Sequence, residues 1–418
     1  MPAEAVGRSE TGGSGGPLGN NAKSHAALSQ NNDLGPFDRE TGEFVQVRQS
    51  GSALVVVRDP AEVRLERFAL QAVARELLPK TRTANCLRVP FRADRKVQVY
   101  HSPAHKSAHY GGLQTCASVW ACPVCMAKIT ERRRVELQAA MAEAERQGLH
   151  VYLLTLTHPH SWFDPLVGLL TSEQQALKQF LGCRGVVHLF RDLGRVGQVR
   201  AWEVTHGRLR AFSHGWHPHF HILLFLSEPI GDLPSVESSL YVHWANACVR
   251  SGLERPSERF GVRLDDGSRA ADYIAKMGLE EAKGWGFDSE MTKGHCKRAK
   301  DGETPLDLLR ACLADPSDHQ AAALFREYAA AFKGKRQLVW SRGLRDRLSL
   351  DAAPSDEELA AACEEDALLL AELTSRQWRR VLRLDARGEL LEIARHGRVD
   401  ALERFLVSLG AGSGAAGV

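Results

Sequence analysis

The sequence predicts a protein of the α+β class, in which an antiparallel sheet packs against helices. Between residues 151 and 282, short apolar runs typical of strands alternate with segments whose apolar residues recur every three or four positions, as in amphipathic helices. The chain of 418 residues is 44% hydrophobic and 25% charged, close to globular averages, which excludes a wholly disordered protein. No run of about 18 apolar residues occurs, so no membrane-spanning helix is expected.

The elements of this segment follow one another in a regular order. Runs of β-branched or alternating residues predict four strands, at Val151–Thr157, Gln198–Thr205, His217–Leu226 and Phe260–Asp266. Helical spacing predicts three helices, at Thr171–Leu193, Ser235–Leu253 and Ser268–Ala282. The order βαββαβ, followed by a helix, predicts a split βαβ, ferredoxin-like antiparallel sheet with helices on one face.

Composition divides the chain into four predicted regions. Residues 1–50 form a disordered N-terminal segment that is rich in Gly, Ser, Asn and Pro. Residues 51–140 form a zinc-binding region, and 141–350 hold the elements above together with basic blocks downstream. Residues 351–418 form a helical C-terminal region, with a helical stretch over 356–382. Nine Cys residues without secretory features favour reduced thiols or metal ligands, and hence a cytoplasmic location.

Three closely spaced cysteines predict a structural zinc site. Cys116, Cys122 and Cys125 fall within ten residues, and the CPVC knuckle suits tetrahedral Zn²⁺. The fourth ligand must come from elsewhere, and Cys86 lies upstream at a plausible distance. The alternatives are three histidines, His101, His105 and His109. Four further cysteines fall in apolar helical patterns typical of packing residues, namely Cys183, Cys248, Cys312 and Cys363.

The run HPHFH predicts a second metal site. His219 and His221 alternate along a strand, so both side chains face the same side of the sheet. Two imidazoles on one face supply half of a divalent metal site. If GRLRAFSHGW is a hairpin loop, antiparallel pairing brings Glu203 opposite His219, which completes a site of two His and one carboxylate. If Glu203 is not the third ligand, His158 or His160 is the next candidate. The ordinary interpretation of the HPHFH run is a solvated strand edge that binds no metal.

The helix predicted after the last strand carries a candidate nucleophile. Tyr273 and Lys276 are three residues apart and therefore share a helix face. A phenol beside a metal-bound phosphate can attack it, although a pKa of about 10 means that it needs assistance. Lys276 can stabilise the charge of the phenolate or phosphate. The ordinary interpretation is core packing for the tyrosine, and Tyr241 and Tyr328 are the alternatives.

Two basic stretches predict contacts with DNA. KGHCKRAK (293–300) contains no acid, and KGKRQLVWSRGLRDR (333–347) places a tryptophan among cations, a mixture suited to phosphate contacts and base stacking. Solvated loops are the ordinary interpretation of such runs. The candidate DNA-binding residues are Lys293, Lys297, Arg298, Lys333, Lys335, Arg336, Trp340 and Arg342.

Together these motifs resemble the plasmid rolling-circle replication initiators (Rep proteins) of the HUH endonuclease superfamily. LTLT (154–157) is similar to the first motif strand, GWHPHFHILL (215–224) to the metal-binding HUH motif, and YIAKMG (273–278) to the nucleophile helix. CASVWACPVCMAKITERRRVEL (116–137) is similar to the upstream Cys-containing stretch of many bacterial members. TPLDLL (304–309) and GKRQLVWSRGL (334–344) are similar to downstream blocks. The resemblance extends from about Cys86 to Leu344.

The resemblance implies an HUH endonuclease domain that nicks and joins DNA with the help of Mg²⁺ or Mn²⁺. The metal, held by Glu203, His219 and His221, would polarise the scissile phosphate, and attack by Tyr273 would give a 5′-phosphotyrosine and a free 3′-OH. The implied partner is the double-strand origin of a plasmid, with the nick site extruded or single-stranded. The host replication helicase and polymerase are further partners, and a membrane is not.

The chain departs from one form of the family pattern. Some members carry the nucleophile directly after the Lys, with a terminating Glu four residues earlier. Here Met277 follows Lys276, and Tyr273 occupies the Glu position, so the terminating group stays open between Glu280 and Glu281.

Two other functions remain as alternatives. A rolling-circle transposase or relaxase shares the metal-and-tyrosine chemistry, although a relaxase normally places its tyrosine before the His motif. A zinc-stabilised DNA-binding regulator without catalysis would bury Tyr273 and hold no exchangeable metal at His219 and His221.

Overall fold

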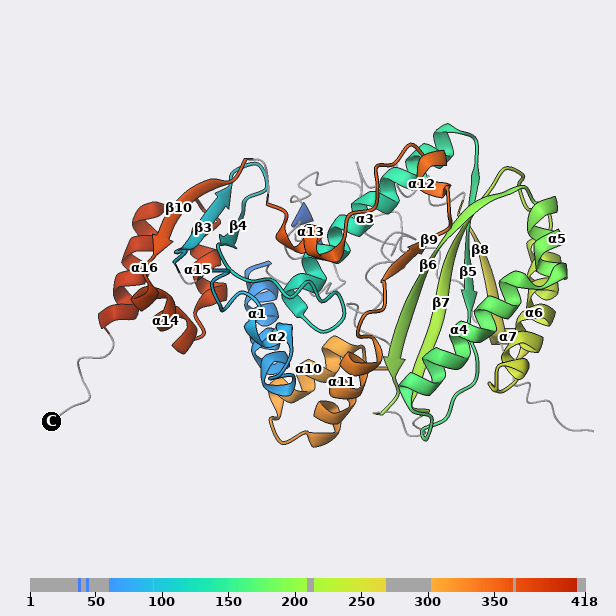
Figure 1. The fold of residues 1–418 in the computed structure, drawn as a ribbon, viewed down its shortest axis with the longest axis horizontal. Coiled ribbons are helices and arrows are strands. Elements are labelled where there is room, and N and C mark those ends of the chain that lie inside the picture. The colour runs from blue at the N-terminus through green and yellow to red at the C-terminus, as the bar shows by residue number, and fades with distance from the viewer. Residues whose placement is uncertain are drawn as a thin grey trace, which may run out of the picture.

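A computed structural model describes residues 37–38, 43–44, 60–92, 94–208, 214–267, 302–363 and 366–411 (Figure 1). The protein is α+β, with antiparallel sheets. In Figure 1 a small three-stranded sheet lies at one end of the molecule and a larger five-stranded sheet at the other, with helices between them. No helix in the described part of the chain combines the length and apolar character needed to cross a membrane.

The larger sheet has the strand order β8-β5-β7-β6-β9, and all its neighbours are antiparallel. Its strands are β5 (His150–Leu156), β6 (Arg195–His206), β7 (Trp216–Leu226), β8 (Val262–Asp266) and β9 (Leu338–Trp340). The four strands predicted from sequence are confirmed, and β9 was not predicted. Because β7 lies between β5 and β6, these two strands run in the same direction and the connection between them is a split βαβ unit.

Four helices cover one face of this sheet: α4 (Leu166–Gly182), α5 (Arg184–Asp192), α6 (Leu233–Arg250) and α7 (Glu258–Gly261). Trp202, Phe220 and Ile222 face them in a shared apolar core with Phe180 and Trp244. The single helix predicted over 171–193 is wrong in one respect. The backbone is extended at residue 183 (ψ 143°), and this break separates α4 from α5.

The opposite face is covered by α3 (Pro123–Arg146) and α12 (Leu344–Arg347), so the prediction of helices on one face only is wrong. Leu137 and Met141 of α3 pack with Leu223 and Phe225 of β7 in a second core. The apolar stripe of α3 is predictable from spacing, but the sheet face that it covers depends on long-range packing. Figure 1 shows α3 running from the middle of the molecule toward the larger sheet.

The smaller sheet has the order β10-β3-β4 and consists of β3 (Val97–Ser102), β4 (Ser107–Gly111) and β10 (Leu368–Leu373). The helical stretch predicted over 356–382 is therefore wrong: α13 (Asp356–Ala361) ends early, β10 pairs with β3, and α14 (Ser375–Arg383) begins after it. The run Leu368–Leu370 suits a helix or a strand, and pairing with a distant strand decides between them. Cys363 lies exposed before β10 rather than in a helix, which corrects its predicted packing role.

The C-terminal elements share a core with the region that precedes the larger sheet. Val99 and Tyr110 of the small sheet pack with Trp378 of α14 and Leu390 of α15 (Arg387–Ala394), and α16 (Val399–Ala411) completes this cluster. The Trp378 indole Nε1 donates to the carbonyl of Arg88 at 2.8 Å. Segments predicted as separate regions therefore fold against each other.

The remaining helices lie between the two sheets: α1 (Pro60–Leu77), α2 (Arg82–Asn85), α10 (Pro305–Ala314) and α11 (His319–Ala331). Arg208, beyond the end of β6, forms ion pairs with Glu303 and Asp318, both at 2.7 Å, and so ties α10 and α11 to the β6–β7 hairpin. Two further short strands, β1 (Phe37–Asp38) and β2 (Glu43–Phe44), pair within the segment predicted as disordered.

Candidate metal centres

The first candidate centre lies on the β6–β7 hairpin. Glu203 of β6 is directly opposite His219 of β7, as predicted from the length of the connection, and Ala201 is opposite His221. The alternation of β7 sends Phe220 and Ile222 to the core beneath α4, and the two imidazoles to the other face. The predicted register is confirmed.

The three side chains converge on one point. The Glu203 Oε2 atom is 3.0 Å from His221 Nε2 and 3.5 Å from His219 Nε2, and the two Nε2 atoms are 3.2 Å apart. Two ligand atoms at right angles, each about 2.1 Å from a metal, lie about 3.0 Å apart. The donor set therefore fits a divalent cation held by two imidazoles and one carboxylate.

The hydrogen bonds around the group favour the ionised form of Glu203, which is the form that binds a cation. Burial by itself raises the pKa of the Glu203 carboxyl, but hydrogen bonds from His219 and His221 hold it well below its usual range, so the group is ionised. Thr155 of β5 lies next to His221, with Thr155 Oγ1 3.1 Å from His221 Nδ1. This contact orients the ring so that Nε2 faces the centre.

Other histidines surround the centre without joining it. His160 Nε2 lies 2.6 Å from His217 Nδ1, and burial, with the nearby His219 and His160, lowers the pKa of His217 well below its usual value. His158 is buried, which lowers its pKa to about 4. Among the described residues, the ligand group here consists of Glu203, His219 and His221 alone. The alternatives His158 and His160 are therefore not part of the convergent set.

The second candidate centre is a cluster of four buried cysteines, Cys86, Cys116, Cys122 and Cys125. The Cys86 Sγ is 3.4 Å from the Cys125 Sγ and 3.7 Å from the Cys122 Sγ, and the Cys116 Sγ is 3.7 Å from the Cys125 Sγ. Four sulfurs about 2.3 Å from a tetrahedral zinc lie about 3.8 Å from one another. The geometry fits Zn²⁺ with Cys86 as the fourth thiol.

Local contacts favour a negative sulfur at Cys122, whereas the neighbouring thiols and burial raise the pKa of Cys86 and Cys125. Cys122 caps the N-terminus of α3, and Pro123 occupies the first helical position. Burial opposes ionisation of Cys122, but hydrogen bonds from the other three cysteines lower its pKa well below the usual value. The backbone N–H of Cys116 points at the Cys86 sulfur at 3.4 Å, and the Gln71 amide points at the Cys122 sulfur at 3.4 Å. Such outer contacts stabilise bound thiolates.

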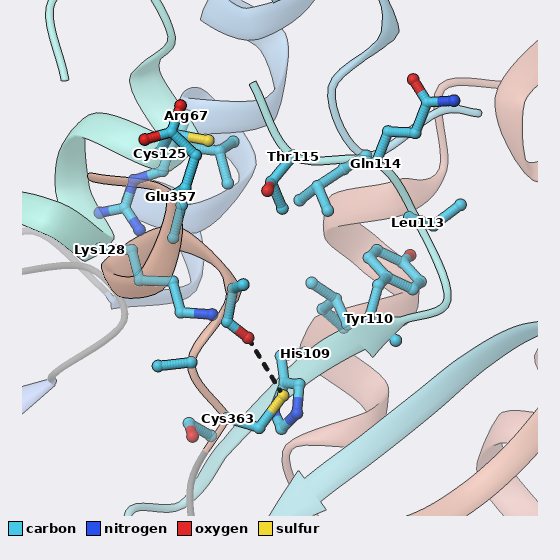
Figure 2. A pocket seen from close by; sticks show the side chains of 18 of the residues that line it. Arg67, His109, Tyr110, Leu113, Gln114, Thr115, Cys125, Lys128, Glu357 and Cys363 are labelled. Atoms are coloured by element: carbon cyan, nitrogen blue, oxygen red, sulfur yellow. Dashed lines mark hydrogen bonds between the residues drawn. The ribbon is translucent and has the colours of Figure 1, made fainter. Parts of the chain in front are cut away.

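His109, an alternative fourth ligand, does not join the cysteines. It lines a cavity of about 730 Å³ beside them, which Cys125 also borders. Among the lining residues drawn in Figure 2, His109 and Cys363 are seen toward one end and Cys125 toward the other. Its ring stacks on Tyr100 with centroids 5.2 Å apart, and burial beside Lys128 and Arg132 lowers its pKa to about 4.

Several predicted residues lie outside the described residues: Tyr273, Lys276, Met277, Glu280, Glu281, Lys293, Lys297 and Arg298. Of the alternative tyrosines, Tyr241 donates its hydroxyl to the carbonyl of Pro256 at 3.1 Å, and Tyr328 is fully buried. Neither belongs to the convergent group on the β6–β7 hairpin.

The downstream basic block follows α11 and leads through β9. Lys333, Arg336 and Arg342 are exposed, and Lys335 is half-buried. Trp340 of β9 packs against the second core, with the Arg345 guanidinium 4.9 Å from the centre of its ring. Sequence reasoning missed Arg200 of β6, whose side chain reaches the same area. Its position in an alternating strand gave no basic run that would have marked it.

Two curated relatives are similar to this chain. The Streptomyces lividans protein named "Protein rep" is 28% identical over 313 aligned residues, which cover 59% of this chain and 66% of the relative. The Streptomyces cyanogenus protein named "Neomycin resistance protein" is 28% identical over 145 residues, 28% of this chain and 31% of the relative. The chain thus spans just under two thirds of the first relative and about a third of the second.

The similarity to "Protein rep" confirms the resemblance to Rep proteins that the motifs indicated. No family model matches the chain. No solved structure matches it either.

Proposed function

We propose that this protein is a plasmid rolling-circle replication initiator that nicks and joins one DNA strand at the origin. The observation that carries the proposal is the convergence of Glu203, His219 and His221 on one hairpin, in a chain similar to a Rep protein. The strand order of the larger sheet, with β7 inside a split βαβ unit, supports an HUH fold of the ferredoxin-like type. On this proposal, residues 141–350 form the endonuclease domain and act in the bacterial cytoplasm.

The residues of the hairpin would bind the metal and orient it. Glu203 would supply a negative charge, His219 and His221 would each supply a ring Nε2 atom as a ligand, and Thr155 contacts the His221 ring at Nδ1. A bound Mg²⁺ or Mn²⁺ would polarise the scissile phosphate as a Lewis acid. The neighbouring His217 stays neutral because it is buried, so it adds no positive charge that would compete with the cation.

Tyr273 is the proposed nucleophile. Its phenol oxygen would attack the phosphorus and lose its proton, and the 3′-oxygen of the preceding nucleotide would leave and take up a proton. The products are a 5′-phosphotyrosine and a free 3′-OH, from which synthesis is primed. Lys276 would stabilise the charge on the phosphate during attack. Joining reverses these steps, with the 3′-OH as the nucleophile.

The cysteine cluster has a different proposed role. A closed set of four thiolates leaves no position for a substrate, so zinc bound there would stabilise the fold rather than react. The site ties Cys86, after α2, to the start of α3, which covers one face of the larger sheet. Zinc would thus support the region against which the endonuclease sheet packs.

Formation of a covalent adduct tests the proposal. Purified protein with Mg²⁺ and a supercoiled plasmid that carries the origin should give a nicked plasmid with protein attached to the 5′ end. Tyr273→Phe keeps the ring and removes only the oxygen, so nick and adduct should both disappear while the melting temperature is unchanged. Tyr241→Phe is the matched control and should retain both.

The alternatives predict other results. An adduct that still forms with Tyr273→Phe would overturn the assignment of the nucleophile. Tight origin binding without nick or adduct in the wild-type protein would favour the non-catalytic zinc-stabilised regulator. Nicking at the ends of a mobile element or at a transfer origin, rather than at a replication origin, would favour a transposase or relaxase.

A further inference from the structure

A basic cavity lies where β6 meets the segment that leads into β9. It has a volume of about 480 Å³, and its lining includes Arg200, Lys333, Lys335 and Arg336. Of the described residues, no carboxylate lines it, and none of these four cations forms an ion pair with one. The neutral polar groups at its wall are Gln174 and Gln337.

The floor of the cavity is a pair of stacked aromatic rings. Trp202 and Phe220 lie nearly parallel, with ring centres 5.0 Å apart. The Lys335 ammonium lies 4.7 Å from the centre of the Trp202 ring, and the Arg200 guanidinium lies 5.6 Å from that of Phe220. Cation–π contacts hold both head groups in place. Because cations cover these buried rings, bases cannot stack on them, and the cavity presents positive charge rather than an aromatic face.

The positive charges of Arg200 and Lys335 are not neutralised by the carboxyl group buried beneath the cavity. Burial lowers the pKa of Arg200, and burial together with Arg200 lowers the pKa of Lys335. The acid whose charge acts on both Arg200 and Lys335 is Glu173, which accepts a hydrogen bond from the Trp202 indole at 2.9 Å. Burial raises the pKa of Glu173 to about 8, so this carboxyl is mainly protonated at neutral pH. Placing the partly buried head groups of Arg200 and Lys335 together is unfavourable unless an anion joins them.

The shape of the approach restricts the anion. Gly334 has a positive φ of 76°, which turns the chain so that the residues on both sides of it reach the cavity. A single phosphodiester can enter a hollow of this size, whereas a duplex can only lie across its rim. Trp202 and Glu203 are neighbours on β6 and point to opposite faces of the sheet, so the cavity and the candidate metal centre are at the same height on opposite faces.

We infer that Arg200, Lys335, Lys333 and Arg336 form a binding site for a backbone phosphate of single-stranded DNA. This inference deepens the proposed function and rests on it for the identity of the strand. A strand bound here and at the metal centre would pass around the edge of the sheet where β9 begins at Leu338. The site would thus fix the path of the strand outside the reacting position.

Binding of a fluorescent oligo(dT) strand to the full-length protein tests the inference, in Mg²⁺-free buffer so that no nicking is required. Arg200→Met keeps most of the apolar stem over the rings and removes the charge. We expect its dissociation constant to rise about tenfold, and the slope of log affinity against log salt to fall by about 0.7, as for one lost phosphate contact on a single strand. Lys335→Met should act in the same direction.

The matched control is Arg184→Met, which removes the same charge from the exposed N-terminus of α5. The double variant Lys333→Met, Arg336→Met changes exposed side chains only and should also weaken binding, which guards against a folding defect at Arg200. Affinities equal to that of Arg184→Met would overturn the inference. An equal loss on duplex DNA, or full displacement of the strand by inorganic phosphate, would also overturn it.

These outcomes separate the two proposals. If oligo(dT) binding depends on Arg200 but no adduct forms on an origin plasmid, the phosphate site stands and the nicking function fails. If the adduct forms but Arg200→Met binds oligo(dT) normally, the nicking function stands and the phosphate site fails.

Discussion

The two candidate metal centres of this protein differ in how completely the chain surrounds them. The cysteine cluster supplies four ligands, and the side chains of Cys86 and Cys122 are fully buried. The centre on the β6–β7 hairpin supplies three ligands, and the His219 side chain keeps 12% of its surface exposed. A closed set of ligands stabilises a fold, whereas an incomplete set leaves positions for water or substrate. On the proposed function, this difference gives the cysteine cluster a role in stability and the hairpin centre a role in chemistry.

The largest expected effect is on stability, at the cysteine cluster. Structural zinc sites contribute about 10–16 kcal/mol of apparent binding free energy to folding, and Cys122→Ser removes one buried thiolate. We expect the variant to lose bound zinc and most of its soluble, folded protein. Metal analysis should show about one zinc per wild-type chain. Cys363→Ser, at the exposed cysteine, is the control, and a zinc-free Cys122→Ser protein that melts like the wild type would contradict the comparison.

The next largest effect is on activity, at the hairpin centre. His219→Ala and His221→Ala each remove a metal ligand, so nicking should fall by at least about 10³-fold, the scale of a lost electrostatic stabiliser. Duplex origin binding should change little, because affinity comes mainly from backbone phosphate contacts. Brief treatment with EDTA should stop nicking, and added Mg²⁺ should restore it. His396→Ala on the exposed C-terminal surface is the control. Full nicking in EDTA would show that the hairpin centre needs no exchangeable metal, which contradicts its proposed chemical role.

A smaller effect should appear at a residue that orients a ligand. Thr155→Val keeps the shape of the side chain and removes the hydroxyl next to His221 Nδ1. Loss of such an outer contact lowers metal affinity or activity by about 10–100-fold. We therefore expect nicking to need more Mg²⁺, with little change at saturating metal. Thr171→Val, on the exposed surface of α4, is the control. Unchanged Mg²⁺ dependence would show that His221 is oriented by other contacts.

A separate effect on the rate of nicking should come from Lys276, whose proposed role is a single charge near the reacting phosphate. Lys276→Ala should slow nicking by about 10–10³-fold without changing zinc content or melting temperature. Lys276→Arg should recover part of the rate because the charge remains. A rate for Lys276→Ala equal to that of the wild type would contradict the proposed role of Lys276 and leave only Tyr273 and the metal ligands in the reaction.

The sequence by itself determined the local features that rest on short-range chemistry. The alternation of HPHFH and the length of the hairpin loop were enough to place Glu203 opposite His219, because antiparallel pairing has a fixed period of two. The spacing of Cys116, Cys122 and Cys125 was enough to predict a thiolate cluster, because a tetrahedral metal requires thiols that can meet. The four central strands could also be predicted, because their alternating and β-branched residues are local features of each strand.

Only the tertiary structure decided the features that depend on distant partners. Cys86 joined the thiols and His109 did not, although both lay within reach along the chain. The run Leu368–Leu370 became part of β10 because β3 offered it a partner, while its local pattern suited a helix equally well. Arg200 met Lys335 over the rings of Trp202 and Phe220 because β9 pairs with β6 across more than 130 residues of sequence. Local spacing carries information about one element, and the contacts between elements form only when the chain has folded.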